Sequence, residues 1–389
     1  MSRLSLFWGS VGLITYTYAV YPALILVRGA LRKKPYQMAE ITPTVSMIIA
    51  AYNEAESIGE KLENVLALDY PKDKLQVLVA SDGSTDGTNE IVKQYEKHGI
   101  TLLALPRGGK APALNKAVSY ATGDILVFSD ANSMYRPDAI RALTRPFADP
   151  KVGCVAGNQS YRKETDAGSG DGERGYWNFD QMLKKAQSKA GNAISATGAI
   201  YSIRRSLFQT VPEGVTDDFV TSTRVIAQGY RLVYAPDAIA YENVAKSSKA
   251  EFGRKVRVIT RGLQSVITMR ELLNPFRHGF YAFQLFSHKI LRRMVVFPLI
   301  ALFIISPLLW TYGLIYQLAT LAQVAFYGLG FIGWKFDEKK FAKSKLFSIP
   351  FFFCMVNLSS LLATLNIIRG RKIKRWETHR QEEPATDMS

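Results

Sequence analysis

Three long stretches of the chain carry no charged residue, and this pattern is typical of membrane segments. They cover residues 4–27, 294–334 and 346–368. A helix of about 20 apolar residues spans the hydrocarbon core of a bilayer, and core helices of soluble proteins rarely extend so far without a charge. The pattern predicts an N-terminal membrane anchor in residues 1–34 and C-terminal membrane segments in residues 294–370.

The charges beside these stretches predict their orientation. Basic residues cluster in residues 28–34, directly after the first stretch. They indicate an uncleaved anchor and place the next domain on the cytoplasmic side of a plasma (inner) membrane. The stretch 294–334 can form two helices with a turn near Tyr312–Tyr316. Four crossings would then leave the basic residues 369–375 outside, so we expect one C-terminal segment, with the one containing Pro350 as a candidate, to be interfacial or re-entrant.

Residues 35–248 have the pattern of a soluble domain. Short apolar runs rich in β-branched residues alternate with helical periodicities, which is typical of an α/β fold with a mainly parallel sheet. Ligands of such sheets bind beyond the carboxyl ends of the strands. The polar residues 162–175 are expected to form a loop. We expect strands at 45–50, 76–81, 101–105, 125–129 and 152–157, and helices at 58–68, 89–98 and 111–120.

Residues 249–293 are predicted to form amphipathic interfacial helices before the C-terminal membrane segments. Within residues 251–274, apolar residues recur at helical spacing, and Arg254, Arg257 and Arg261 share another face. A basic amphipathic helix beside a membrane segment usually lies on anionic lipid. A row of arginines can instead hold a diphosphate, and different members of this row can serve each purpose.

Composition narrows the class of partner. The chain has 49 Lys and Arg against 33 Asp and Glu, a formal net charge of +16, which indicates an anionic partner. The basic residues lie beside the apolar stretches and not with exposed aromatic residues, so membrane lipids are favoured over nucleic acid. Cys154 and Cys354 predict neither a disulfide framework nor a thiolate metal site. Residues 371–389 form a polar tail.

Polar residues follow two of the expected strands directly. Asp82 comes at a strand end, where a carboxylate can accept a hydrogen bond from a ribose hydroxyl or a base. Residues 84–86, which follow it, are typical of caps and turns. Asp130 and Asn132 offer the oxygen ligands that a hard divalent cation prefers, and such a cation would neutralise a leaving diphosphate.

A glycine-containing loop and an acidic pair add further candidate chemistry. Residues 107–110, Arg-Gly-Gly-Lys, resemble a phosphate-binding loop but lack the spacing of a P-loop. Lys110 is therefore either a phosphate ligand or a solvated loop lysine. Asp217 and Asp218 are either a signal for a helix N-terminus or a general base whose pKa the neighbouring carboxylate raises.

These pieces, in this order, resemble family 2 glycosyltransferases of the membrane polysaccharide-synthase kind, which include poly-N-acetylglucosamine, hyaluronan and cellulose synthases. The resemblance covers residues 43 to about 265 together with the membrane segments, and it is specific only as an ensemble. It rests on Ala51-Tyr52-Asn53-Glu54, Asp82-Gly83-Ser84-Thr85-Asp86, Gly109-Lys110 with Ala113-Leu114-Asn115, Asp130-Ala131-Asn132 and Thr216-Asp217-Asp218.

The resemblance implies a GT-A fold and a nucleoside-diphosphate sugar as the donor. Tyr52, Glu54 and Asp82 would contact the base and the ribose. Lys110 would lie beside the donor phosphates, and Asp130 would bind the metal-diphosphate as the first acid of the D-x-D motif.

The same resemblance assigns the acceptor side. Asp218 matches the last residue of the T-E-D motif, the base that deprotonates the acceptor hydroxyl, with Asp217 as its acidic neighbour. The dipeptide 197–198 would lie where such enzymes place the acceptor end. Arg254 and Arg257 match the two ends of the Q/R-x-x-R part of the Q/R-x-x-R-W motif.

Two departures from the family pattern bear on metal binding and on processivity. Asn132 replaces the second acid of D-x-D but still offers a carbonyl oxygen, so Mg²⁺ or Mn²⁺ is expected to bind, more weakly. Val258 replaces the Trp of Q/R-x-x-R-W, which in the synthases supports the acceptor sugar, so processive polymerisation is in question.

The expected function is inverting transfer of a sugar, UDP-linked by preference, to a polysaccharide or lipid-linked acceptor at the membrane. This reaction would serve exopolysaccharide or cell-envelope biosynthesis. Two alternatives stay open: a non-processive transferase that adds one sugar to a lipid, and a non-catalytic membrane module that binds nucleotide sugar or lipid.

Overall fold

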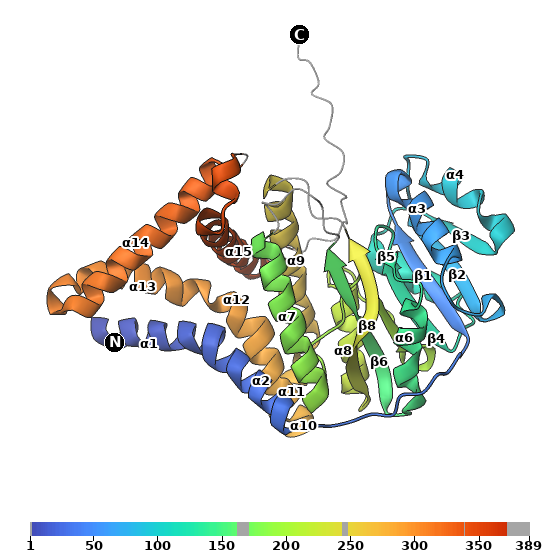
Figure 1. Ribbon diagram of the computed structural model, residues 1–389, viewed down its shortest axis with the longest axis horizontal. Helices are drawn as coiled ribbons and strands as arrows, with labels where there is room; N and C mark the ends of the chain where they lie inside the picture. Colours follow the sequence, from blue (N-terminus) through green and yellow to red (C-terminus); the bar gives the residue numbers. More distant parts are fainter. Residues whose placement is uncertain (1, 162–170, 243–247, 338, 372–389) are drawn as a thin grey trace, which may run out of the picture.

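The core of the protein is a single eight-stranded sheet, seen at the right of Figure 1. The computed structural model describes residues 2–161, 171–242, 248–337 and 339–371. The strand order is β3-β2-β1-β4-β7-β6-β8-β5. The strands are β1 Val45–Ala51, β2 Leu75–Asp82, β3 Ile100–Leu105, β4 Ile125–Asp130, β5 Met134–Tyr135, β6 Val152–Tyr161, β7 Tyr201–Arg204 and β8 Arg231–Glu242.

The sheet is mainly parallel, as the alternating pattern predicts. β1 lies between β2 and β4, and β2 pairs with β3, all in parallel. β6 and β8 form a second parallel pair, while β7 and β5 run antiparallel to their neighbours. The register sets Ala50 opposite Asp130 and Asp82 opposite Leu105. The carboxyl ends of β1, β2 and β4 therefore meet at one edge of the sheet.

Both faces of the sheet are covered, because alternate residues of a strand point to opposite sides. Ile48 of β1 belongs to the apolar cluster under α5 and α8, whereas Met47 belongs to the cluster under α3 and α6. The helices of this domain are α3 Ala55–Leu66, α4 Thr88–Lys93, α5 Lys110–Val118, α6 Ala139–Thr144, α7 Asp171–Ala190 and α8 Asp217–Ala227.

The loop expected at residues 162–175 is helical from residue 171 onward. Residues 162–170 lie outside the described part of the chain, but residues 171–175 are the first residues of α7. The prediction was wrong for that part because it weighed local polarity alone. The later part of α7 buries Leu183 and Gln187, and each residue added to an established helix gains one hydrogen bond.

The membrane-like part, at the left of Figure 1, consists of long apolar helices. The N-terminal helix, Arg3–Leu31, contains α1 Arg3–Thr15, a π-helical turn and α2 Tyr21–Leu31. Within the described residues, this helix, α14 and α15 are each long and apolar enough to cross a membrane, and a fourth candidate is a pair bent by 45°. The pair is Phe280–Met294 with α13 Val296–Leu308, and the other two are α14 Leu314–Lys335 and α15 Lys345–Ile368.

Shorter helices join the two parts. The expected amphipathic helix is α9 Ser248–Thr268, which is followed by α10 Pro275–His278, α11 Phe280–Leu285 and α12 Arg292–Met294. Chain reversal between α13 and α14 occurs at residues 309–313, slightly before the predicted turn. There Phe7 of α1 meets Tyr316 of α14 with ring centroids 4.8 Å apart.

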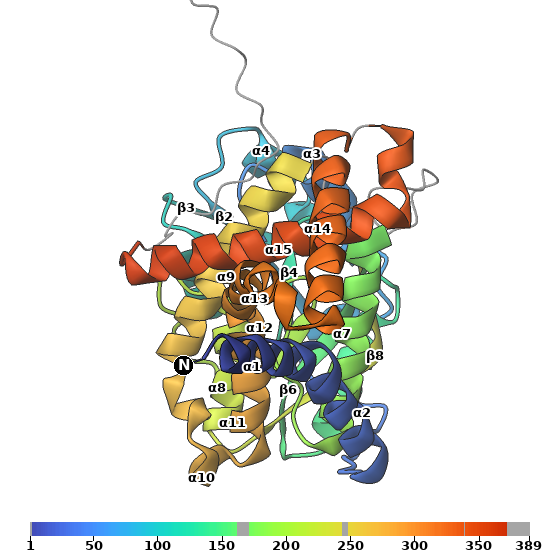
Figure 2. The same cartoon turned by 90° about the vertical axis from the view of Figure 1, so that its left-hand side faces the viewer.

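Close backbone packing fixes two of the helix contacts. A Cβ atom on Gly29 of α2 would lie 2.8 Å from Ala186 of α7, and one on Gly333 of α14 would lie 2.8 Å from the carbonyl oxygen of Phe347 of α15. Small residues allow such approach between membrane helices. α15 packs on α14 and α9. Figure 1 shows α15 nearly end-on while α1 and α13 lie in the plane, and Figure 2 shows the reverse, so α15 crosses their direction.

Candidate functional site

The loop after β3 is held to the end of β2 by Asp82. This carboxylate is 1% exposed and accepts hydrogen bonds from the backbone N–H groups of Gly108 (2.7 Å) and Gly109 (2.8 Å). Arg107 forms an ion pair with it. Asp82 thus anchors the Arg-Gly-Gly-Lys loop, and its contact with a ribose or a base stays a prediction.

Beside this loop, Tyr52 and Arg107 form a stacked pair. The guanidinium carbon of Arg107 lies 3.4 Å from the centroid of the Tyr52 ring. A flat aromatic surface beside a cation is suited to a nucleobase, which can stack on either group.

The segment after β1 is joined to the turn after β2 by hydrogen bonds. Asn53, with φ of 50°, accepts from the Thr85 N–H (2.9 Å), and the N–H of Glu54 donates to the Thr88 hydroxyl (2.9 Å). Asp86 accepts from the Ala55 N–H at 3.0 Å. The residues expected to serve as caps and turns do so here. Glu54 itself is buried, and its side chain accepts from Ser57.

Lys110 connects three distant segments of the chain. Its Nζ lies 2.7 Å from Asp130 Oδ1 and 3.3 Å from Asp217 Oδ2. Lys110 begins α5, Asp130 ends β4 and Asp217 begins α8. Burial lowers the pKa of Lys110, but the two carboxylates raise it more strongly, so the ammonium group stays charged. Lys110 is thus ion-paired at the start of α5, and its contact with a donor phosphate stays a prediction.

Space for a ligand is left beside this ion pair by Gly198. A Cβ atom at this position would lie 3.2 Å from Lys110 Nζ and 3.3 Å from Asp130 Oδ2. Two buried hydroxyls of the neighbouring segments, Thr197 Oγ1 and Thr216 Oγ1, have no hydrogen-bond partner among the described residues, and Asp217 Oδ2 has only its ion pair with Lys110. Buried polar atoms rarely stay unpaired in native proteins, so this arrangement indicates a place for a polar ligand.

Asp218 directly follows Asp217 in the chain, and its side chain is only partly buried. Its Oδ1 accepts from the Phe219 N–H at 2.8 Å. Burial, and then the charge of Asp217, raise the pKa of Asp218 to about 6, against the opposing effect of Lys110. A carboxylate with such a pKa can accept a proton near neutral pH.

The turn after β4 carries the oxygen ligands expected for a metal. Among the described residues, no three His, Cys, Asp or Glu side chains are grouped so that they could hold an ion alone. Mg²⁺ is commonly bound by one or two protein oxygens together with water and substrate phosphates. Asp130 and Asn132 offer oxygen atoms of this kind, and the binding of a cation to them stays a prediction.

This turn is supported from beneath by a buried lysine that sequence reasoning missed. Lys61 of α3 is fully buried, donates to the Ser133 carbonyl, and its Nζ lies 4.0 Å from the centroid of the Tyr135 ring. Burial lowers its pKa to about 7, although Asp130 and Glu242 act in the opposite direction. Its position in the helical pattern gives no indication of this contact across the sheet.

The arginines that share one face of α9 interact with different acidic residues. Arg254 pairs with Glu251 of the same helix at 2.7 Å, whereas Arg261 is buried enough to lower its pKa and is attracted to Asp217. Arg257 is half-buried on the same helix. Arg261 is therefore an additional arginine beside the acidic pair, and the diphosphate contacts of Arg254 and Arg257 stay a prediction.

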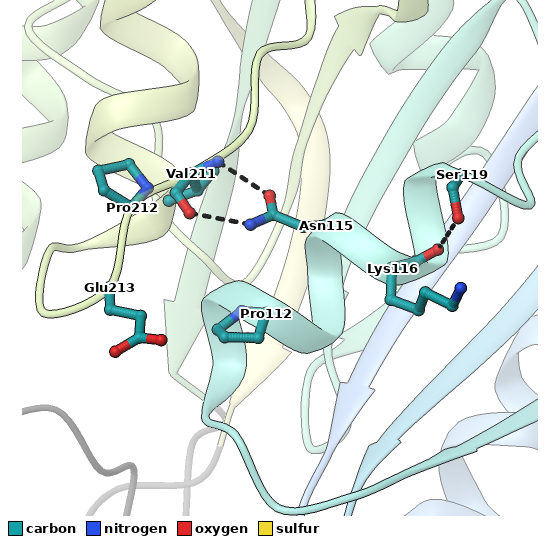
Figure 3. Close-up of a pocket in the computed structure, with 7 residues that line it drawn as sticks. All are labelled: Pro112, Asn115, Lys116, Ser119, Val211, Pro212 and Glu213. Carbon is teal, nitrogen blue, oxygen red and sulfur yellow. Dashed lines mark hydrogen bonds between the residues drawn. The ribbon is translucent and has the colours of Figure 1, made fainter.

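A pocket on the outer side of α5 lies away from this chemistry (Figure 3). It is lined by Pro112, Asn115 and Ser119 of the α5 region and by residues 211–213. Asn115 donates to the Val211 carbonyl oxygen (2.9 Å) and accepts from the Val211 N–H (2.8 Å), as the dashed lines show. These bonds position the segment that leads to Asp217.

Part of the chain is similar to a known protein family. Residues 46–211 match the family described as "Glycosyl transferase family 2". Poly-beta-1,6-N-acetyl-D-glucosamine synthase from Staphylococcus aureus (strain COL) is 29% identical over 238 residues, 59% of this chain and 57% of that protein. The synthase of the same name from Staphylococcus epidermidis is 27% identical over 286 residues, 69% of this chain and 67% of that protein.

The similarity to a solved structure extends further along the chain. A mannosyltransferase from Pyrobaculum calidifontis, in complex with GDP-Man and Mn²⁺, matches with a TM-score of 0.70. The match covers 94% of this chain and 99% of the mannosyltransferase at 24% identity, which shows a shared fold. The curated S. aureus relative is matched over 57% of its length, so its whole activity is not carried over by similarity alone.

Proposed function

Because the chain contains a glycosyl transferase family 2 domain with the predicted GT-A fold, we propose that it is an inverting glycosyltransferase. It takes a sugar from a nucleoside-diphosphate sugar, UDP-linked by preference, and transfers it to a saccharide or lipid-linked acceptor in exopolysaccharide or cell-envelope synthesis. The names of the curated relatives support such a product, and the mannosyltransferase shows that the fold accommodates a nucleotide sugar.

The observation that carries this proposal is the Lys110 bridge. It joins Asp130 and Asp217 in one cluster beside Gly198, with Asp218 next in the chain. Donor phosphate ligands and a proton acceptor are the two groups that sugar transfer needs within reach of one anomeric carbon.

The chemistry follows from the charge of each side chain. Asp218 accepts the proton of the acceptor hydroxyl, whose oxygen attacks the anomeric carbon from the side opposite the leaving group. The bond to the nucleoside diphosphate breaks, its electron pair leaves with the diphosphate, and the configuration inverts. Lys110 stabilises the negative charge that develops on the diphosphate, and Arg261 lies close enough to Asp217 to add to that field.

Asp130 and Asn132 would hold Mg²⁺ or Mn²⁺. When bound, the cation neutralises charge on the diphosphate. Lys61 holds the turn that carries both residues, through the Ser133 carbonyl.

The membrane arrangement that we propose has three crossings and one in-plane helix. The N-terminal helix, the bent pair ending in α13, and α14 would cross, with α13 and α14 returning beside Phe7. α15 would lie at the cytoplasmic interface, because it crosses the direction of α1 and α13 and packs on α9 (Figures 1 and 2). This arrangement leaves Arg369 and Arg371 inside, as the positive-inside rule requires.

A reporter fused after Arg371 tests this arrangement. Green fluorescent protein at that position should fluoresce and alkaline phosphatase should be inactive, since only the former works in the cytoplasm. Active phosphatase would show that α15 crosses the membrane.

The function is tested by release of nucleoside diphosphate from a set of UDP- and GDP-sugars by the purified full-length protein, with and without Mn²⁺. Asp218→Asn should abolish release but leave UDP affinity within about twofold, because the amide keeps the shape but cannot accept the proton. Asp237→Asn, at an exposed position of β8, is the matched control.

The outcomes separate the candidate functions. No release from any donor would favour a binding module, and equal loss of UDP affinity in Asp218→Asn would contradict the assigned role. Product length separates a processive synthase from a single-sugar transferase.

A further inference from the structure

A group of cations lies where the catalytic domain meets the membrane helices. α7 stands between the sheet and α2 and α11 (Figure 1). On it, Lys184 is only 4% exposed, and Lys289, from the helix that continues towards α13, is partly buried. Nζ of Lys184 lies 5.9 Å from the Tyr234 ring centroid, and Nζ of Lys289 lies 5.6 Å from that of Phe219.

Within the described part of the chain, these two ammonium groups have no direct anionic partner. Neither makes a hydrogen bond or an ion pair with any residue in the described ranges, only the two ring contacts. A buried charge without a partner is costly, and burial accordingly lowers the pKa of Lys184, against the opposing effects of Asp180 and Asp218. Buried ionisable groups with a perturbed pKa cluster at functional sites.

The acid within this group is already engaged. Asp180 Oδ1 lies 3.1 Å from His288 Nε2 and 3.5 Å from Arg292 Nη1. Gln187 Nε2 lies 3.3 Å from His288 Nδ1 and 3.3 Å from the Tyr21 hydroxyl. This network holds the helices of the junction together, and it leaves Lys184 and Lys289 available for another anion.

The two lysines also lie on the acceptor side of the candidate base. Phe219, which is next to Asp218, is the residue whose ring Lys289 covers. Both ammonium groups attract the Asp218 carboxylate electrostatically, though neither lies within ion-pair distance of it. Lys110 serves the donor side of the acidic pair, and Lys184 and Lys289 lie towards the membrane.

We propose that Lys184 and Lys289 bind the phosphate of a lipid-linked acceptor and thereby bring its hydroxyl group to Asp218. This inference rests on the proposed function and names the acceptor class. Two ammonium groups suit a phosphate. The acceptor is a lipid because the helix that carries Lys289 leads directly into the apolar α13. The phosphate keeps all its bonds during transfer: only the hydroxyl proton moves, to Asp218.

Binding of undecaprenyl phosphate to the full-length protein in nanodiscs tests the proposal. The Lys184→Met/Lys289→Met double variant should bind it roughly 10- to 100-fold more weakly, since each lost charged contact is worth more than a neutral one. Lys185→Met, at the exposed neighbouring position of α7, should bind like the unmodified protein. Lys184→Arg keeps the charge and should retain most of the affinity.

Competition identifies the source of the phosphate. Undecaprenol, which lacks phosphate, and inorganic phosphate, which lacks lipid, should both compete weakly. Equal binding by the double variant and the unmodified protein would overturn the proposal, as would competition by inorganic phosphate as strong as that by the lipid phosphate.

UDP affinity, measured in parallel, distinguishes failure of the phosphate site from failure of the proposed glycosyltransferase function. It should be unchanged in the double variant, and its retention also shows that the variant is folded. If the unmodified protein released no nucleotide from any donor but bound the lipid phosphate through these lysines, the proposed function would fail and the phosphate site would stand.

Discussion

The two sides of the acidic pair Asp217–Asp218 differ in how their lysines are compensated. On the donor side, Lys110 lies within 2.7 Å of Asp130 and 3.3 Å of Asp217. On the membrane side, Lys184 is more deeply buried, but among the described residues it makes no hydrogen bond or ion pair and contacts the Tyr234 ring. The first lysine is paired before any ligand arrives, while the second carries a charge that the protein alone does not satisfy.

This difference shows that burial alone does not determine the function of a lysine. A paired lysine sets the geometry of the carboxylates around it, so its loss should affect both binding and chemistry. A lysine without a partner contributes mainly when its ligand is present. Variants on the two sides should therefore separate into those that change the donor step and those that change acceptor binding.

The largest effect is expected from Lys110→Met. Removal of the ammonium leaves Asp130 and Asp217 without their shared cation, and it removes positive charge from the leaving diphosphate. The rate of UDP release should fall by about 10²- to 10³-fold, with weaker UDP binding. Lys116→Met, at an exposed position of α5, should change neither. A Lys110 variant with normal UDP affinity and turnover would remove the distinction between the two sides.

Gly198→Val should come next, since it fills the space beside the donor-side ion pair. The added side chain would start 3.2 Å from Lys110 Nζ and 3.3 Å from Asp130 Oδ2. We expect at least about a tenfold loss of kcat/KM with unchanged binding of the lipid phosphate. Gly191→Val provides the control, because a Cβ atom at Gly191 meets nothing within 4 Å. Equal losses in both variants would point to a general effect on folding.

The pH dependence should report on Asp218 in particular. Burial and Asp217 raise the pKa of Asp218 to about 6, and only the carboxylate form can accept a proton. Activity is therefore present above pH 6 and is lost as the pH falls through 6, by about tenfold per unit. Asp217→Asn removes the charge that raises this pKa, so the acidic limb of kcat/KM should move to lower pH. A limb that stays in place in Asp217→Asn would show that another group titrates.

Much of this arrangement could be predicted from sequence because it depends on local patterns. The five expected strands lie within the observed ones, since short apolar runs rich in β-branched residues are typical of strands buried on both faces of a parallel sheet. Asp82 ends β2 and Asp130 ends β4 at the same edge of the sheet, because parallel strands bring their carboxyl ends together. β7 is short and antiparallel, and its four residues carry no comparable periodic signal.

The residues that escaped prediction are those whose role depends on packing between distant elements. Lys184 lies in a polar helix and Lys289 in a segment beside a membrane span, and neither position indicates the ring contact that each lysine makes. Arg254 is different: Glu251 lies three residues before it, a spacing at which helical side chains pair. That signal in the sequence could have directed attention to Arg261 instead.

The smallest effect is expected from Asn115→Ala in the pocket of Figure 3. Asn115 makes two hydrogen bonds to the backbone of Val211, so its truncation should cost about 1–3 kcal/mol and lower the melting temperature by a few degrees. Ser119→Ala, in the same pocket, removes only a bond to Lys116 on its own helix and should change stability less.

Because Val211 precedes Asp217 by a short segment, the Asn115→Ala variant should also lower kcat modestly, with unchanged affinity for the lipid phosphate. A loss of lipid phosphate binding instead would mean that this segment positions Lys184 or Lys289 rather than the acidic pair. The positions of the acidic pair and of the membrane-side lysines would then depend on each other. The two sides of Asp218 would differ in how their lysines are paired, but they would not be structurally independent.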